Sequence, residues 1–216
     1  MKNLFLILLG AIILFGCGRK STTNHAQEHM HASSFEELVQ RFEDSTRAEW
    51  QKPNEVIAFM AIDSKDVIAD IGAGTGYFTF PMAKKAGKVI AIDIEDNFIN
   101  YLHGQKAIKG ADNVEIRKSE ADAPELEELE CTKIAIVNTV HHFEKIAKYL
   151  NKCRKALRFG GSLYIIDFKE GDLPVGPPNN IKLPLNDLKR ELGLAGFHNL
   201  TVETELLPYQ YIVKAN

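Results

Sequence analysis

An acidic residue and three alternate glycines form a stretch whose residue types and spacing suggest chemistry. It reads Asp70-Ile-Gly72-Ala-Gly74-Thr-Gly76 and follows the apolar run Val67-Ile68-Ala69. Glycines let the backbone bend sharply at the carboxyl end of a strand, and they leave no side chain between the main chain and a ligand. The pattern predicts a turn that binds a nucleotide-like molecule, although the same glycines could form only a tight loop.

Two departures from other glycine turns indicate which ligand to expect. A dinucleotide-binding turn needs a glycine at position 77, where this chain has Tyr77. A phosphate-binding loop needs a lysine directly after its last glycine, and none follows Gly76. The turn therefore suits a ligand whose recognisable parts are an amino acid, a ribose and an adenine. We expect S-adenosylmethionine.

A second carboxylate follows at the spacing expected for a ribose contact. The apolar run Lys88–Asp93 reads as a buried strand that ends about 20 residues beyond the first glycine of the turn. Asp93 can accept hydrogen bonds from both ribose hydroxyls, and we include its neighbour Ile94 in the same site. Asp93 could instead cap the helix expected over 97–109, because Asp is favoured at helix starts.

These motifs and several later ones resemble the class I S-adenosylmethionine-dependent methyltransferases over residues 35–213. The later motifs are an acidic pair, an Asn-Thr-Val-His-His segment and a Gly-Gly turn: Glu120 and Asp122, Asn138–His142, and Leu157–Leu163. Three further segments are similar to an exported subgroup of bacterial methyltransferase-like proteins: Trp50–Pro53, Val175–Pro178 and Leu207–Tyr211.

The resemblance implies a role for each cofactor-binding residue. The three glycines would face the methionine part of the cofactor, and Asp93 would face its ribose. The adenine amino group would contact Asp122, with Glu120 as the second choice. Asp70 would hold the turn together or meet the ammonium group through water, and it could equally cap the strand end.

Asn138, His141 and His142 follow the fourth strand, where members of the family meet the transferring methyl group. Methyl transfer is an in-line displacement, so the enzyme mainly aligns donor and acceptor and needs a base only when the acceptor loses a proton. An imidazole could accept that proton. The two histidines could equally brace the backbone or cap a helix. Trp50 is expected to close over the cofactor, with packing beneath the sheet as the alternative.

Strands and helices alternate along the chain, which indicates a parallel sheet covered on both faces. The predicted strands cover 67–71, 88–93, 113–118, 132–138 and 161–168, and the predicted helices cover 77–86, 96–109, 142–158 and 186–195. Two closing strands, 198–206 and 209–214, are too close in sequence to pair in parallel. We predict an α/β fold: a Rossmann-like, doubly wound, mostly parallel seven-stranded sheet with a carboxyl-terminal antiparallel hairpin. The hairpin and Tyr77 argue against a dehydrogenase.

The amino terminus differs in composition from the rest of the chain. Leu4–Phe15 is nearly purely apolar and precedes Gly16-Cys17. It is short for a membrane span, which needs about 20 residues, and it resembles a bacterial lipoprotein signal in which Cys17 carries lipid. We therefore expect three parts: a signal over 1–17, a polar tether over 18–34 and the methyltransferase domain over 35–216.

The signal predicts a lipoprotein whose domain lies outside the cytoplasm, on the periplasmic side of a membrane. The alternative is an uncleaved anchor with the domain on the cytoplasmic face, since Lys2 and the amino terminus balance Arg19 and Lys20 across the apolar run.

The tether contains three histidines, His25, His29 and His31, which could bind copper or nickel. Nothing in this segment would order such ligands, so we interpret it as flexible and predict no metal site.

Composition narrows the class of function. The net charge of −3 and the lack of a Lys/Arg cluster argue against a nucleic-acid partner. We expect an enzyme that transfers a methyl group to an unidentified small-molecule acceptor. The alternative is an exported binding or scaffold protein without catalysis, because the methyl donor is made inside the cell. The oligomeric state is left open.

Overall fold

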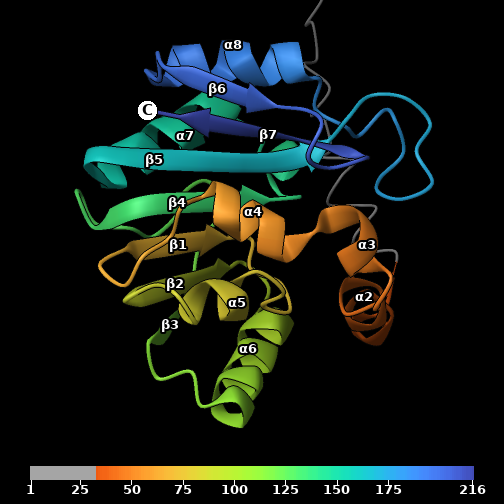
Figure 1. Ribbon diagram of the computed structural model, residues 1–216, viewed down its shortest axis with the longest axis vertical. Coiled ribbons are helices and arrows are strands. Elements are labelled where there is room, and N and C mark those ends of the chain that lie inside the picture. Colours follow the sequence, from red (N-terminus) through yellow and green to blue (C-terminus); the bar gives the residue numbers. More distant parts are fainter. Residues whose placement is uncertain (1–32) are drawn as a thin grey trace, which may run out of the picture.

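Short runs of β-branched and small apolar residues build a seven-stranded sheet in the computed structural model, which describes residues 33–216 (Figure 1). The strands are β1 (Val67–Ile71), β2 (Lys88–Asp93), β3 (Val114–Lys118), β4 (Cys131–Val137), β5 (Leu157–Phe168), β6 (Leu200–Glu203) and β7 (Gln210–Ala215). They lie in the order β3-β2-β1-β4-β5-β7-β6. Strands β1 to β5 pair in parallel, and β7 runs antiparallel to both β5 and β6. The predicted fold class and closing hairpin are confirmed.

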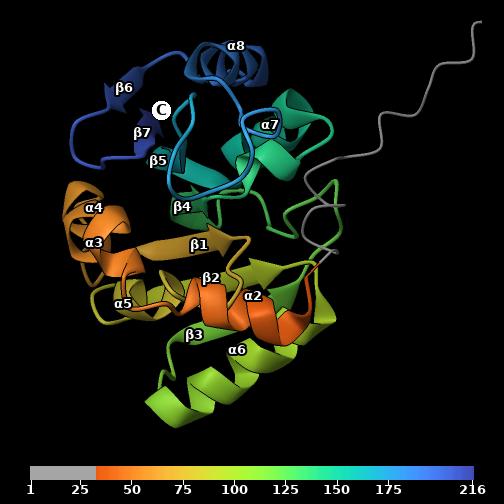
Figure 2. The same cartoon turned by 90° about the vertical axis from the view of Figure 1, so that its right-hand side faces the viewer.

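Helices cover both faces of the sheet, and further helices lie at the carboxyl ends of its parallel strands (Figures 1 and 2). They are α2 (Phe35–Phe42), α3 (Arg47–Gln51), α4 (Pro53–Phe59), α5 (Thr79–Ala83), α6 (Asp96–Lys109), α7 (Ile146–Ala156) and α8 (Leu185–Ala195), with a 3-10 turn, η1, at Val140–His142. Side chains of α4, α5 and α6 share one hydrophobic core with the sheet, and those of α7 and α8 share the other.

Alternate residues of the central strands supply the two cores. Ile68 and Val89 point into the core beneath α4 and α5, while Ala69 and Ile90 point into the core beneath α7 and α8. A strand buried on both faces reads as a continuous apolar run rather than an alternating one. The strand positions can therefore be predicted from continuous apolar runs in the sequence.

The helix boundaries differ from the prediction where local chemistry interrupts the periodic pattern. Helix α5 is shorter than predicted and begins at Thr79, which puts Pro81 inside its first turn, where proline is tolerated. Helix α7 begins at Ile146 rather than 142 because the preceding residues form η1. Strand β6 ends at Glu203, whose carboxylate accepts backbone hydrogen bonds from Glu205 and Leu206 and turns the chain.

Several predictions concern residues before 33 and lie outside the part that the structure describes. They are the signal over 1–17, the lipid on Cys17, the tether up to residue 32 and its histidines His25, His29 and His31. Within residues 33–216, none of the helices has the length and apolar character needed to cross a membrane.

Candidate active site

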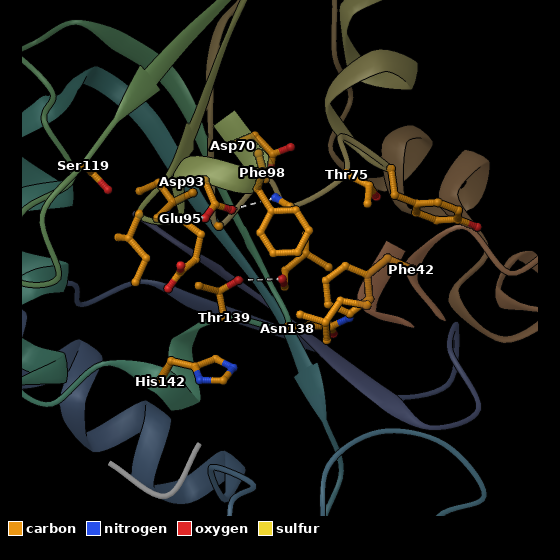
Figure 3. A pocket seen from close by; sticks show the side chains of 18 of the residues that line it. Phe42, Asp70, Thr75, Asp93, Glu95, Phe98, Ser119, Asn138, Thr139 and His142 are labelled. Carbon is orange, nitrogen blue, oxygen red and sulfur yellow. Dashed lines mark hydrogen bonds between the residues drawn. The ribbon is translucent and has the colours of Figure 1, made fainter. Parts of the chain in front are cut away.

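A cavity of about 290 Å³ lies at the carboxyl ends of β1, β2 and β4 (Figure 3). The strand order reverses between β1 and β4, and ligands of open α/β sheets bind at such a point. Its walls come from the turn after β1, the ends of β2, β3 and β4, and helices α2 and α3. Figure 2 shows α2 in front of β2 and β3, with α3 beside α4.

The glycine turn forms part of the cavity wall, but its glycines serve more than one purpose. Gly72 and Gly74 line the cavity, whereas Gly76 is not among the lining residues. All three have positive φ, which side chains rarely adopt. A Cβ on Gly72 would lie 2.2 Å from Thr139 Oγ1, and one on Gly76 would lie 2.4 Å from a carbon of the Phe80 ring. Packing alone therefore excludes a side chain at these two positions, and at Gly72 this requirement stands beside the predicted role of a bare backbone next to a ligand.

Asp93 ties the glycine turn to the end of β2 and also lines the cavity. Its Oδ2 accepts a hydrogen bond from the Gly74 amide at 2.8 Å (Figure 3). Its Oδ1 accepts one from the Glu95 amide at 3.1 Å. Burial raises the pKa of the Asp93 carboxyl. The N-cap residue of α6 is Glu95, so Asp93 does not cap this helix and that alternative is wrong. Ile94 lines the cavity next to it.

Asp70 lines the cavity from the end of β1. Its Oδ2 accepts a hydrogen bond from the Thr79 hydroxyl at 2.5 Å, which joins the strand end to the start of α5. Burial is the main reason that the pKa of Asp70 rises to about 6, and the neighbouring Asp93 charge acts in the same direction. Asp70 thus holds the turn together, one of the two roles expected for it.

The acidic pair after β3 is split between the cavity and solvent. Glu120 lines the cavity, while Asp122 is exposed and lies 3.9 and 4.0 Å from the amino groups of Lys148 and Lys152. A bridge between Glu120 and Ala123 turns the chain sharply here, which leaves the two acidic side chains in different places. The predicted preference for Asp122 is therefore reversed: Glu120 is the acidic residue at the cavity.

The histidine pair is also divided. His142 lines the cavity, whereas the buried His141 does not. The Nδ1 atom of His141 lies 2.9 Å from both oxygens of the fully buried Asp167 carboxylate, to which it donates. The two imidazole rings lie 4.4 Å apart. The bracing role fits His141, and the role facing a reactant fits His142.

Asn138 lines the cavity at the end of β4 in a left-handed conformation, with φ of 56°. Its side-chain oxygen accepts a hydrogen bond from Gln210 Nε2, which comes from β7. The closing hairpin therefore fixes the side chain of a cavity residue.

Two features of the site were missed in the sequence. Phe35, Leu38 and Phe42 of α2 line the cavity, and the Phe42 ring stacks on Phe98 of α6 with centroids 5.7 Å apart. Their spacing is that of one helix face, which predicts a helix but not the surface it covers.

Trp50, expected over the cofactor, instead packs near the rings of Phe168 and Tyr209 and lies outside the cavity lining.

The second missed feature is Arg47 of α3, which lines the cavity. Its guanidinium carbon lies 4.0 Å from the centroid of the Tyr77 ring, and partial burial lowers the pKa of this group to about 10. No sequence motif surrounds it, so only the fold brings it to the site.

Comparisons with known proteins agree with this geometry. Residues 62–198 match the family described as Methyltransferase domain. A solved structure of a SAM dependent methyltransferase from Aquifex aeolicus aligns with a TM-score of 0.78 at 24% identity, over 85% of this chain and 98% of that one.

Curated relatives are similar over smaller parts. Phosphoethanolamine N-methyltransferase 1 of Triticum aestivum is 29% identical over 156 residues, which is 68% of this chain and 30% of the relative. A "Probable ribosomal RNA small subunit methyltransferase A" of Methanosphaera stadtmanae is 40% identical over 70 residues, 32% of this chain and 26% of the relative. The match thus spans less than a third of each of these relatives. Since the family match covers more than half of the 216 residues, the chain belongs to the methyltransferase-domain family.

Proposed function

We propose that this chain is an S-adenosylmethionine-dependent methyltransferase that acts on a small-molecule acceptor. The charge of the cavity is the observation that carries this proposal. Among the described lining residues there are four carboxylates and a single guanidinium: Asp70, Asp93, Glu95, Glu120 and Arg47. S-adenosylmethionine carries a sulfonium, an ammonium and one carboxylate, so its charges complement those of the lining.

Other observations also fit this cofactor. The Thr75 hydroxyl is buried on the glycine turn without a hydrogen-bond partner among the described residues, and a bound ligand would satisfy it. Asp93 would accept from the ribose hydroxyls, Glu120 from the adenine amino group, and the Gly72–Gly74 backbone would contact the amino-acid part. When bound, the cofactor supplies an electrophilic methyl group.

The chain's own residues position and deprotonate the acceptor. His142 stands at the cavity beside the end of β4, where its imidazole would accept a proton from a hydroxyl or thiol group. His141, which is held by Asp167, supports the 3-10 turn η1 that carries His142. Asn138, held by Gln210, would contact the reacting groups from β4. In-line methyl transfer mainly requires that the acceptor be aligned with the methyl donor.

A small acceptor is favoured over RNA on electrostatic grounds. The relatives include phosphoethanolamine and ribosomal RNA methyltransferases, so both acceptor classes occur among similar proteins. The net charge of −3 and the acidic lining would repel a phosphate backbone.

We also propose that the protein belongs to the exported subgroup and is anchored through lipid on Cys17. This is supported by the apolar run 4–15 that precedes Gly16-Cys17 and by the segments 50–53, 175–178 and 207–211. The cytoplasmic face of the inner membrane is the alternative address.

Calorimetric titration of the full chain in detergent with S-adenosylmethionine tests the proposed function. We expect micromolar binding that Asp93→Ala weakens by roughly 1.5 to 3 kcal/mol, because hydrogen bonds to a charged acceptor are lost. Glu120→Ala should also weaken binding, whereas Asp122→Ala, the matched control with an exposed carboxylate, should leave it unchanged. A wild-type chain that binds neither S-adenosylmethionine nor its demethylated product refutes the proposal. A chain that binds the cofactor tightly and methylates neither RNA nor any member of a small-molecule panel would favour the scaffold alternative.

A further inference from the structure

We propose that Arg47 and Thr75 form a subsite for the carboxylate of the cofactor's amino-acid part. Helix α3, which carries Arg47, precedes the family-matched residues 62–198, so this subsite would extend the binding site beyond the matched domain. The inference deepens the proposed function and rests on it.

The Arg47 guanidinium is held so that one nitrogen is left for a ligand. Its Nε donates to Gln51 Oε1 at 2.5 Å, and its Nη1 donates to the Phe42 carbonyl at 2.6 Å. The group also stacks over the Tyr77 ring. Its Nη2 makes no hydrogen bond to any residue in the described part of the chain. A guanidinium fixed in this way is well suited to bind a carboxylate, because little side-chain freedom is lost on binding.

Thr75 supplies a second, independent observation. Its side chain is buried, lies on the glycine turn, and its hydroxyl has no partner among residues 33–216. A buried hydroxyl without a partner destabilises the fold, so such groups are usually satisfied. A carboxylate oxygen in the cavity would accept this hydrogen bond.

Arg47 and Thr75 lie where the amino-acid part of a ligand would be if its ribose were bound by Asp93. Figure 3 shows Thr75 and Phe42 at one side of the cavity, and Asp93, Glu95 and Ser119 at the other. Arg47 joins the Phe42 side through its bond to the Phe42 carbonyl. A ligand whose ribose lies at Asp93 and whose adenine lies toward Ser119 would therefore extend its amino-acid part toward Arg47 and Thr75.

The charge of the cavity lining also favours a cationic group that binds the ligand's carboxylate. The other four charged groups of the described lining are carboxylates, which repel a carboxylate ligand. Arg47 is the cationic lining residue that can offset this repulsion, and guanidinium–carboxylate hydrogen bonds are among the stronger ones in proteins.

The experiment compares two ligands that differ only in the carboxylate: S-adenosylmethionine and its decarboxylated analogue. Both are titrated by calorimetry into the full-length wild type, Arg47→Met, Thr75→Val and Arg190→Met. The last is the control, because Arg190 is an exposed arginine of α8 paired with Asp187. We expect the wild type to prefer the carboxylated ligand about 10- to 100-fold. Arg47→Met should lose that preference by weakening only S-adenosylmethionine, Thr75→Val should lose part of it, and Arg190→Met should retain it.

The alternative is that Arg47 only holds α3 in place. Equal weakening of both ligands in Arg47→Met, or a wild type that binds them equally well, overturns the inference. If Arg47→Met does not fold, as judged by circular dichroism, the same comparison with Arg47→Lys and Thr75→Val decides the question. Failure of the proposed function gives a different result, since the wild type would then bind neither ligand.

Discussion

Asp70, the last residue but one of β1, and Asp93, the last residue of β2, lie on adjacent parallel strands, and both carboxylates are buried at the edge of the cavity. Burial raises the pKa of each carboxyl, while hydrogen bonds from Thr79 to Asp70 and from the Gly74 amide to Asp93 oppose the increase. Two buried anions so close together destabilise the fold without a ligand. Perturbed carboxyls of this kind are typical of functional sites, where a cationic ligand offsets their charge.

The titration of Asp70 gives a test at this scale. Its pKa is about 6 in the folded chain against a usual value of 3.8, so the folded state keeps a proton that the unfolded state has lost. The contribution of Asp70 to the free energy of unfolding should therefore fall as the pH rises from 4 to 6, by up to about 3 kcal/mol. In Asp70→Asn this fall should be absent, because the amide does not titrate and its oxygen still accepts from Thr79.

Urea unfolding of the wild type and Asp70→Asn at pH 4, 5, 6 and 7 measures this difference. The variant should gain stability relative to the wild type with each step up to pH 6 and little beyond it. A difference between the two proteins that stays constant over the whole range would show that Asp70 is not protonated in this window.

At the scale of elements, the site depends on a contact between the turn after β1 and helix α2. A Cβ on Gly74 would lie 3.6 Å from the Phe42 ring, which is an ordinary van der Waals contact. The turn, α2 and α6 thus meet at Phe42, which also stacks on Phe98. Gly74 differs in this from Gly72 and Gly76, where the space is already filled by the body of the domain.

Gly74→Val should abolish cofactor binding and leave the domain folded. Its φ of +54° costs a valine about 1 to 2 kcal/mol, and the branched methyl groups would push Phe42 and enter the cavity. Gly104→Ala is the matched control: Gly104 lies inside α6 with nothing within 4 Å, so alanine should raise stability by about 0.5 to 1 kcal/mol without affecting binding. Calorimetry and circular dichroism follow both. Full binding by a natively folded Gly74→Val would mean that the turn does not contact the ligand.

At the scale of the whole molecule, the question is where the domain operates. The two cysteines in the described part, Cys131 and Cys153, are free and buried. Burial raises the pKa of the Cys131 thiol to about 12 and raises that of Cys153 as well. Such thiols are inert, so the domain would tolerate an oxidising compartment as well as a reducing one.

The address is tested through Cys17. Radiolabelled palmitate should enter the wild-type chain and not Cys17→Ser, and a phosphatase fused to the carboxyl terminus should be active outside the cytoplasm. Cys131→Ser should still be labelled, since its thiol is buried in the domain core. An unlabelled, full-length chain with a silent fusion would instead place the enzyme at the cytoplasmic face, next to the source of its methyl donor.

The sequence by itself determined the order and type of most elements, the position of the glycine turn and the Asp93 strand end. These follow from local causes: apolar runs mark buried strands, glycine permits positive φ, and two strands close in sequence can only pair antiparallel. The same local patterns placed helix starts less well, as at Thr79 and Ile146, because turns of a few residues compete there with regular helix.

Only the tertiary structure decided which side chains share the cavity. It put Glu120 rather than Asp122 at the site, set His142 toward the cavity with His141 against Asp167, and brought Arg47 to the end of β1. Each of these outcomes depends on the direction of a side chain after a turn, or on contacts between segments that are far apart in the chain. Residue types and spacings do not specify such contacts, because they form only when the sheet brings its strand ends and helices together.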